Sequence, residues 1–308
     1  MELLLSARQL VAQDPQKITA DLIAEYVQQI DGSPATIRTY KACVNRFCAW
    51  LSEKDLTADY ETIVIYKRHL GESMKAKAVN THLAAIKDLF RFLERKGIKN
   101  EARNVKKEKI AGGFVRDPLT AEQVRQILES IDRSTQNGAR EYALFKLLVQ
   151  TGLRECEAVR ADLDDIQTKG NRTVLYIQGK GESEKNNYVV LYPSVLEALQ
   201  HYFKMRGAKP GEPLFISTSN HNRGERITTR TVQRIVKSLY ERNGIISRNI
   251  TTHSTRHTAV TLSILNGADI QQAQAMARHK NINTTMLYYH SINRLEDNAE
   301  ARLEQLFS

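Results

Sequence analysis

Residues 253–258 read His-Ser-Thr-Arg-His-Thr, and this stretch narrows the possible folds of the 308-residue chain more than any other. His253, Arg256 and His257 lie within about one and a half turns of a predicted helix. His253 and His257 share a helix face as two zinc ligands would, but Ser254 stands where a zinc protease needs its glutamate. No cysteine or carboxylate cluster accompanies them in the sequence. The stretch therefore predicts no metal site.

Further polar segments lie on both sides of this stretch. Arg154 follows a Thr-Gly-Leu break, and Glu157 comes three residues later, one turn along a helix. The other members are Lys180, between two glycines, and His279, Tyr288, Tyr289 and His290. The glycines around Lys180 lack P-loop spacing, and the chain has no G-x-S-x-G elbow. Nucleotide hydrolysis and acyl transfer by a serine are therefore not supported.

Arginines, a lysine, histidines and a tyrosine together suit transfer of a phosphodiester. Arginine presents a planar fork of donors that grips non-bridging phosphate oxygens. These oxygens gain charge in a five-coordinate transition state, and fixed donors stabilise that charge without a metal. A tyrosine oxygen is a competent nucleophile, and its attack is reversible because phenolate leaves well. Lys180 in a mobile loop could protonate a leaving sugar oxygen.

The charge of the whole chain fits such a substrate. Lysines and arginines number 45 against 35 acidic residues, a formal net charge of +10. Such an excess favours a polyanion, either a nucleic acid or an anionic membrane surface.

Secretion and membrane insertion are not expected. The run Leu3-Leu4-Leu5 is too short for a signal sequence, and the most apolar stretch, Tyr142 to Val149, is interrupted by Lys146. Three cysteines lack C-x-x-C spacing and are odd in number, as expected for reduced thiols in a cytoplasmic protein.

Helical periodicity fills the first hundred residues. Ser33 and Pro34 form an N-cap and first-turn pair, and Gly97 stands where a helix would stop. The expected helices cover Ile18 to Ile30, Ile37 to Leu51, Thr62 to Leu70 and Val79 to Leu93. Four helices of this length predict a small bundle, and we assign residues 1–100 to it.

Lysines and helix breakers between Lys99 and Asp117 predict a basic linker over residues 101–117. Residues 118–308 then form a second domain. Its first helix is expected to start at a capping box made by Thr120 and Gln123.

Residues 173–178 and 188–192 are rich in β-branched and aromatic side chains and flank a polar loop, which predicts a hairpin. Another buried helix is expected before a break at Gly152, and helices return after the hairpin. The fold class predicted from these patterns is mainly α with a small antiparallel β-sheet.

Four ordered segments resemble the conserved boxes of the tyrosine recombinases, the phage-integrase and Xer type. They are Thr151-Gly-Leu-Arg-Glu-Cys-Glu157, Gly179-Lys180-Gly181, His253 to Thr258, and Arg278-His279 with Thr284 to His290. Thr36 to Leu51 and Ala78 to Leu93 are similar to the paired helices of the family's N-terminal core-binding domain. The resemblance covers nearly the whole chain and implies that a core-binding domain precedes an α+β catalytic domain.

The resemblance also implies a role for each matched residue. Tyr288 would attack the scissile phosphate, form a 3′-phosphotyrosyl bond and release a 5′-hydroxyl. Arg154 and Arg256 would clamp the phosphate, and Lys180 would protonate the leaving oxygen. The remaining assignments are His253 as a hydrogen-bond donor or proton shuttle, His279 as a phosphate ligand or a guide for the tyrosine, Glu157 as a support for Arg154, and His257 as a structural residue.

Three features depart from the family pattern. Thr255 occupies a position that is usually apolar, and Arg278 stands where glycine is common before the histidine. The hairpin loop is slightly longer than usual, so Lys185 is a rival to Lys180 as general acid. Tyr289 neighbours the expected nucleophile, but side chains of adjacent helical residues diverge by about 100°, so only one tyrosine can face the phosphate.

The implied substrate is double-stranded DNA with an inverted-repeat core site. The implied assembly is a homotetramer on DNA that exchanges strands through a four-way junction, and a monomer or weak oligomer when free. No cofactor is expected, because the phosphotyrosine stores the energy of the phosphodiester. Candidate DNA contacts are Arg38, Lys41, Arg46, Lys75, Lys77, Lys87, Lys106, Lys107, Arg230 and Arg234.

Two alternatives remain open at this point. A type IB topoisomerase shares the chemistry but only relaxes supercoils. A DNA-binding regulator of the same fold would lack a reactive group, whereas all six catalytic positions are filled here. The residues do not name the DNA sequence, its spacer, accessory proteins, or a role as integrase, resolvase or dimer-resolution enzyme.

Overall fold

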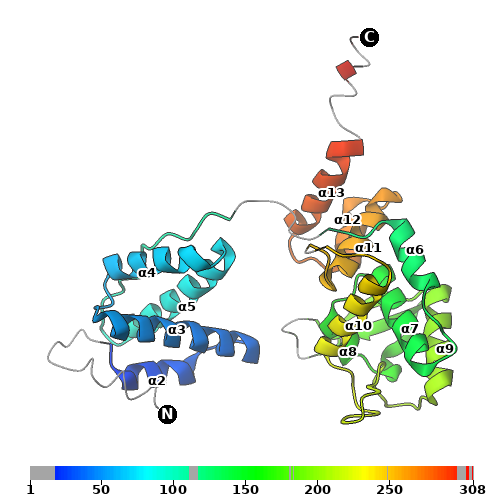
Figure 1. Cartoon of the computed structure of the whole chain (residues 1–308), viewed down its shortest axis with the longest axis horizontal. Coiled ribbons are helices and arrows are strands. Elements are labelled where there is room, and N and C mark those ends of the chain that lie inside the picture. The colour runs from blue at the N-terminus through cyan, green and yellow to red at the C-terminus, as the bar shows by residue number, and fades with distance from the viewer. Residues whose placement is uncertain are drawn as a thin grey trace. The chain divides into compact units, whose positions relative to one another are not determined.

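A computed structural model describes residues 18–110, 117–179, 182, 184–247, 249–296, 303, 304 and 307, with the side chains of 290–296 excepted. The chain divides into two compact units, Met1–Gly112 and Gly113–Ser308 (Figure 1). The predicted fold class, mainly α with a small antiparallel sheet, is confirmed. None of the helices described is long and apolar enough to cross a membrane.

Between residues 18 and 110, the described part of the first unit contains four helices. They are α2 (Ala20–Gln29), α3 (Pro34–Lys54), α4 (Tyr60–Ser73) and α5 (Ala76–Arg95). The predicted start of α3 is confirmed, because the Ser33 side chain accepts a hydrogen bond from the Thr36 amide at 3.2 Å and Pro34 opens the helix. The predicted stop is confirmed too: Gly97 has φ +85°, and the Ile98 amide donates to the Leu93 carbonyl at 3.0 Å.

The core of this unit lies between α5 and the other helices. One face of α5 is fully buried, from Val79 to Leu93, and it packs against α3, α4 and α2. Phe47 and Trp50 of α3 place their rings about Tyr66 of α4, at centroid distances of 4.9 and 5.0 Å. The periodic apolar residues of the sequence therefore form the predicted bundle (Figure 1).

The chain after α5 continues to pack on the first unit. Ala102 and Val105 are buried in its core, and the Asn80 side chain pairs with both backbone groups of Glu108 at 2.8 and 2.9 Å. The predicted linker begins at residue 101, whereas packed chain extends to Glu108. Two small apolar residues three apart are a weak signal among lysines, and nothing in the sequence pairs Asn80 with this segment.

The second unit surrounds the long helix α7 (Gln136–Thr151). Its other helices are α6 (Ala121–Glu129), α8 (Glu155–Arg160), α9 (Pro193–Arg206), α10 (Thr229–Arg242), α11 (His253–Leu265), α12 (Ile270–Ala277) and α13 (Ile282–Glu296), with a short 3₁₀ turn, η2 (Leu163–Asp165). α7 contacts α6, α8, α9, α10 and α11. The capping box predicted at the start of α6 is confirmed by the two bonds between Thr120 and Gln123, at 3.0 and 3.1 Å.

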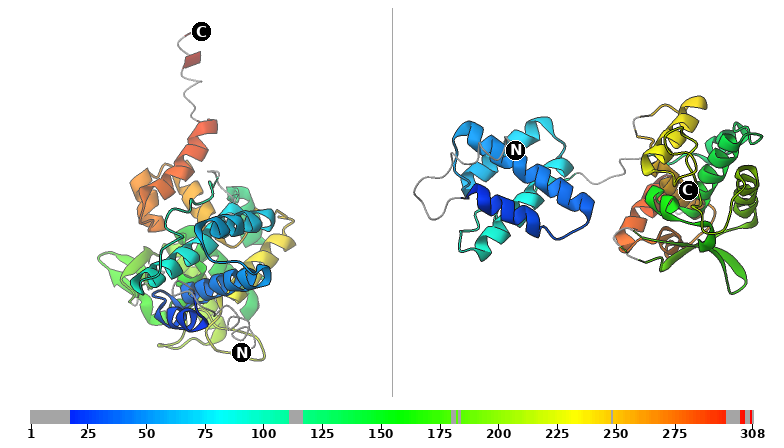
Figure 2. Two further views of the ribbon diagram at one scale, coloured as in Figure 1. Left: turned by 90° about the vertical axis from the view of Figure 1, so that its left-hand side faces the viewer. Right: turned by 90° about the horizontal axis from the view of Figure 1, so that it is seen from below.

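A three-stranded antiparallel sheet lies at one edge of this unit, as the right-hand view of Figure 2 shows. Its strands are β1 (Ile166–Lys169), β2 (Arg172–Ile177) and β3 (Asn187–Val190), in the order β1-β2-β3. The hairpin β2–β3 was predicted, and β1 was missed because it is short and polar. The turn Gly170-Asn171, with Gly170 at φ +62°, was the signal that could have revealed it.

Helices α11, α12 and α13 pack against one another and enclose a small second core. Val260, Ile264, Ala273 and Ala277 line it, and the Tyr288 side chain lies among them with 5% of its surface exposed. α7 is capped nearby by Gly152, which has φ +61°, and a Cβ added to this glycine would lie 3.5 Å from Ala259 Cβ. The break predicted at Gly152 thus turns the chain toward α8 beside this core.

The packing of the 101–110 segment makes a prediction about Asn80. Replacing Asn80 by alanine removes both bonds to Glu108 and should destabilise the first unit by about 1–2 kcal/mol. Limited trypsin digestion should then cleave after Lys106, Lys107 and Lys109 faster than in the wild type. Thr81→Ala is the control, since that hydroxyl bonds only to its own helix at Lys77. Equal cleavage rates in all three proteins would contradict the packing described.

Candidate active site

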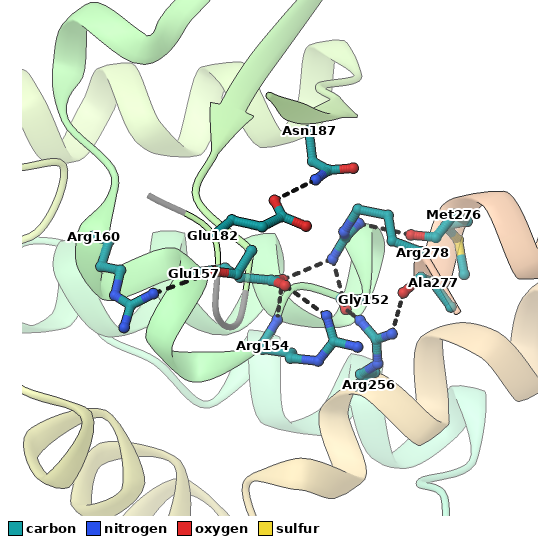
Figure 3. Close-up of polar contacts among 11 residues, drawn as sticks. Gly152, Arg154, Glu157, Arg160, Glu182, Asn187, Arg256, Met276, Ala277 and Arg278 are labelled. Carbon is teal, nitrogen blue, oxygen red and sulfur yellow. Dashed lines mark hydrogen bonds and ion pairs between the residues drawn. The ribbon is translucent and has the colours of Figure 1, made fainter. Parts of the chain in front are cut away.

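Residues far apart in the sequence meet where α8, α11, α12 and α13 approach the end of α7 (Figure 3). Arg154 and Glu157 come from the start of α8, and Arg256 comes from α11. His279 follows α12, and Tyr288 lies on α13. His253 begins α11, so five of the six predicted catalytic residues are described, and Lys180 lies outside the described residues.

Arg154 and Glu157 form the first pair. The Arg154 amide donates to Glu157 Oε2 at 2.8 Å, and its Nη1 donates to Oε1 at 2.7 Å. Glu157 is 1% exposed, whereas the Arg154 side chain keeps 31% of its surface exposed. Burial by itself raises the pKa of Glu157, but Arg278 and Arg154 outweigh that effect and hold the pKa below its usual value. Glu157 is thus an ionised support for Arg154.

Arg256 is held on the opposite side of this turn. Only 2% of it is exposed, and its Nη1 donates to the Gly152 carbonyl at 2.6 Å while Nη2 donates to the Ala277 carbonyl. Burial, with the charges of Arg154 and Arg278, lowers the pKa of Arg256 to about 10. The group still carries its charge at neutral pH. The break at Gly152 therefore supplies a backbone acceptor that orients an arginine 104 residues later.

Arg278 is a member of the site that the sequence analysis noted only as a departure from the family pattern. Its Nη2 donates to Glu157 Oε2 at 2.8 Å, and its Nη1 donates to the Met276 carbonyl at 2.7 Å. Two guanidinium groups thus pair with one carboxylate, and that of Arg256 lies beside them on the Gly152 carbonyl (Figure 3). The arginine in a place usual for glycine was the available signal, but its partner could not be read from the sequence.

His279 lies beside these charges. Its Nδ1 is 2.9 Å from Thr285 Oγ1, and its ring stacks on Tyr288 with centroids 6.1 Å apart. Burial, followed by the charges of Arg256, Arg154 and Arg278, lowers the pKa of His279 to about 4. The imidazole is therefore neutral at physiological pH.

The Tyr288 ring lies between histidines of two segments. His257 approaches it from α11 with ring centroids 5.2 Å apart, and His257 in turn contacts His253 at 5.0 Å. His257 was expected to be structural, and its contact with Tyr288 was not anticipated. Burial raises the pKa of Tyr288 to about 12, against an opposing effect of Arg256. Tyr289 points elsewhere and is 38% exposed.

Lys185, the rival to Lys180, is held in an ion-pair network. Its Nζ lies 2.7 Å from Asp162 and 2.6 Å from Asp165. Burial lowers the pKa of Lys185, but the bonds to both aspartates outweigh it and raise the pKa overall. Lys185 thus retains its proton and anchors the hairpin beside η2.

The predicted DNA contacts are placed on the surface with one exception. Lys87 is half-buried and donates to the Arg103 carbonyl at 3.2 Å. The exposed ones are Arg38, Lys41, Arg46, Lys75, Lys77, Lys106, Lys107, Arg230 and Arg234. The described part of the chain contains no cluster of three or more histidines, cysteines or carboxylates that could hold a metal ion.

Family models match both units. Residues 118–294 match the phage integrase family, and residues 17–97 match the phage integrase N-terminal SAM-like domain. The chain belongs to the phage integrase family. It is a site-specific tyrosine recombinase, an enzyme that exchanges DNA strands by transesterification. The family expected from the four sequence segments is thus confirmed.

Curated relatives of this tyrosine recombinase include Xer proteins. It is 26% identical to tyrosine recombinase XerD of Lacticaseibacillus casei over 283 residues, which cover 88% of this chain and 94% of the relative. It is 32% identical to tyrosine recombinase XerC of Caldanaerobacter subterraneus subsp. tengcongensis over 217 residues, which cover 68% of this chain and 57% of that protein.

Solved recombinase structures share the fold. A XerH site-specific recombinase bound to its palindromic difH substrate in a post-cleavage complex matches with a TM-score of 0.69 at 20% identity, over 93% of this chain and 89% of that one. The Tn1549 transposon integrase in complex with transposon right end DNA matches with a TM-score of 0.69 at 20% identity, over 94% and 99%.

The low pKa of His279 makes the stability of this recombinase depend on pH. Its pKa of about 4 lies below the roughly 6.5 of an unfolded histidine, so the folded state binds the proton less tightly. The stability that comes from keeping His279 neutral in the folded state is fully present above pH 6.5. It is lost as the pH falls toward 4, because the unfolded state takes up a proton first. Between pH 7 and pH 5 the wild type should lose roughly 1–2 kcal/mol more unfolding free energy than His279→Gln.

Urea denaturation at the two pH values measures this difference. His221→Gln is the control, because His221 is exposed on a loop away from the site. The same loss in the wild type and in His279→Gln would contradict a buried, neutral His279.

Proposed function

We propose that Tyr288 is the nucleophile of this recombinase and that Arg154, Arg256 and His279 hold the scissile phosphate. The observation that carries the proposal is their convergence: Arg154 and Arg256 lie near the neutral His279, whose ring stacks on the buried Tyr288, in a chain of this family. The five described catalytic candidates come from three of the four matched segments, and their convergence supports phosphoryl transfer.

The proposed reaction is a transesterification, in which one ester bond to phosphorus forms as another breaks. Tyr288 Oη attacks phosphorus and forms a 3′-phosphotyrosyl bond while the bond from phosphorus to the 5′ oxygen breaks. The tyrosine proton leaves as Oη bonds to phosphorus, and a proton is delivered to the departing 5′ oxygen. A 5′-hydroxyl from another strand then attacks the phosphotyrosine and reverses these steps, which rejoins the DNA without loss of phosphodiester energy.

The pKa values support this division of work. With a pKa of about 12, Tyr288 is protonated before the attack, which protects the buried site from a stray phenolate charge. A phosphate at Arg256 and Arg154 brings negative charge that the guanidinium groups neutralise as it grows in the transition state. Neutral His279 and the neighbouring His257 and His253 are the groups through which the tyrosine proton leaves.

Lys180 is the proposed acid for the leaving 5′ oxygen. In the sequence it lies between two glycines in the segment that joins β2 to β3, and described residues of that segment make fixed contacts. Arg160 Nη1 donates to the Gly179 carbonyl at 3.4 Å, and Lys185 pairs with Asp162 and Asp165. Lys185 is engaged by two carboxylates, which makes it the poorer candidate.

The proposed partner is double-stranded DNA with inverted repeats, bound by a homotetramer during exchange. The exposed cations named above would contact phosphates, with residues 1–100 and 118–308 as the two DNA-binding bodies and a basic linker between them. The XerH structure, bound to palindromic DNA, supports the choice of partner. Strand exchange on chromosomal or mobile DNA places the enzyme in the cytoplasm. A type IB topoisomerase is disfavoured by the match of residues 17–97 to the integrase N-terminal domain.

Replacing Tyr288 by phenylalanine should abolish covalent attachment to DNA and leave DNA affinity unchanged. The ring stays in its apolar core while the attacking oxygen is removed. A nicked suicide substrate traps the adduct, which is read on a denaturing gel, and Tyr289→Phe is the matched control. An adduct that survives in Tyr288→Phe and disappears in Tyr289→Phe would contradict the assignment.

A sulfur-substituted substrate separates Lys180 from Lys185. Lys180→Ala should slow cleavage of ordinary DNA by about 10²–10⁴-fold, as expected for loss of a general acid. Sulfur at the bridging 5′ position should restore the rate, because a thiolate leaves without a proton. Lys185→Ala should show no such rescue. Rescue of Lys185→Ala alone would reverse the two roles.

A further inference from the structure

Three guanidinium groups and one carboxylate share the proposed phosphate site, an arrangement with more cations than the carboxylate can neutralise. Arg154 and Arg256 are assigned to the phosphate. Arg278 is not matched to any family residue, and the mechanism above does not use it.

The contacts of Arg278 tie it to both sides of the site. Its Nη2 donates to Glu157 Oε2 at 2.8 Å and lies 3.5 Å from the Gly152 carbonyl, which also accepts from Arg256. Its Nη1 donates to the Met276 carbonyl at 2.7 Å. One side chain after α12 thus reaches the carboxylate beneath Arg154 and the carbonyl that orients Arg256 (Figure 3).

The backbone of Arg278 adopts a conformation that is unfavourable for a residue with a side chain. Arg278 has φ +54°, the left-handed region that favours glycine, and Asp55 is the other non-glycine residue with positive φ in the described chain. Glycine would end α12 here without strain. An arginine in this conformation is therefore held by the interactions of its guanidinium group.

We propose that Arg278 is a positioning residue for strand cleavage, which acts on the phosphate through Glu157 and Arg154. This inference rests on the proposed function. Glu157 is buried and accepts from Arg154 at both oxygens, so without Arg278 its whole charge would be balanced by Arg154. Arg278 occupies one lone pair of Oε2 and shares that charge, which leaves donors of Arg154 for the phosphate.

Exposure distinguishes this role from direct contact with DNA. The Arg278 side chain is 11% exposed and its Nη1 and Nη2 donate to protein acceptors, whereas the Arg154 side chain is 31% exposed. Arg278 therefore supports the arginine that faces the substrate and does not itself replace it.

The test is single-turnover cleavage of a nicked suicide substrate by the full chain. Arg278→Gly removes the guanidinium group and fits the left-handed backbone. It should slow cleavage about 10- to 100-fold, the loss typical of a misplaced phosphate donor, with DNA affinity unchanged. Asp55→Gly is the matched control, because it also relieves a positive φ but lies in the other unit.

A double-mutant cycle with Glu157→Gln tests the route of the effect. If Arg278 acts through the Glu157 charge, the Arg278→Gly defect should shrink to within a few-fold in the Glu157→Gln background. A merely structural role would give the same fold-loss in both backgrounds. Thermal denaturation of each variant checks folding, and Arg278→Gln is used in the same cycle if the glycine variant does not fold.

Outcomes for the two proposals are distinguishable. Adduct formation by the wild type, and none by Tyr288→Phe, upholds the proposed function whatever Arg278 does. Given that result, the inference is overturned if Arg278→Gly cleaves DNA at the wild-type rate. It is also overturned if Arg278→Gly slows cleavage by the same factor in the wild-type and Glu157→Gln backgrounds. Slow cleavage that couples to Glu157 supports it.

Discussion

The Glu157 carboxylate is buried among positive charges, and the arrangement of the site follows from the need to satisfy it. It accepts from the amide and guanidinium of Arg154 and from the guanidinium of Arg278, so two elements must meet around it. Removing a partner from a buried charge is far more costly than breaking a surface ion pair. This constraint fixes the start of α8 against the end of α12.

The helices around the carboxylate place the other groups. α7 ends at Gly152, whose carbonyl receives Arg256 from the middle of α11. α12 and α13 then pack on α11 over a small apolar core that includes the ring of Tyr288. Burial in that core keeps the tyrosine protonated and His279 neutral, so the same packing that builds the site also sets its protonation states.

Local signals made much of this fold predictable. Ser33, Gly97 and Thr120 end or begin helices through bonds within a few residues, and these were read from the sequence. The order of polar motifs identified the family and most of the site, because those residues recur at recognisable spacings. β1 was missed because its strand is short and polar.

Long-range partners could not be predicted in the same way. Asn80 meets Glu108 and Arg278 meets Glu157 only after the chain has folded, and neither pair has a fixed spacing in the sequence. The role of Arg278 was therefore visible as an unusual residue and not as a contact. His257 of α11 likewise contacts Tyr288 of α13, a residue 31 positions later in the sequence.

We propose that the arginines around the Glu157 carboxylate hold the scissile phosphate for attack by Tyr288. The most direct measurement is mass spectrometry of the peptide that carries DNA after the trapped adduct is digested with protease and nuclease. We expect a nucleotide joined through its 3′ phosphate to Tyr288. A nucleotide on Tyr289 or any other residue, or a 5′ linkage, would contradict it.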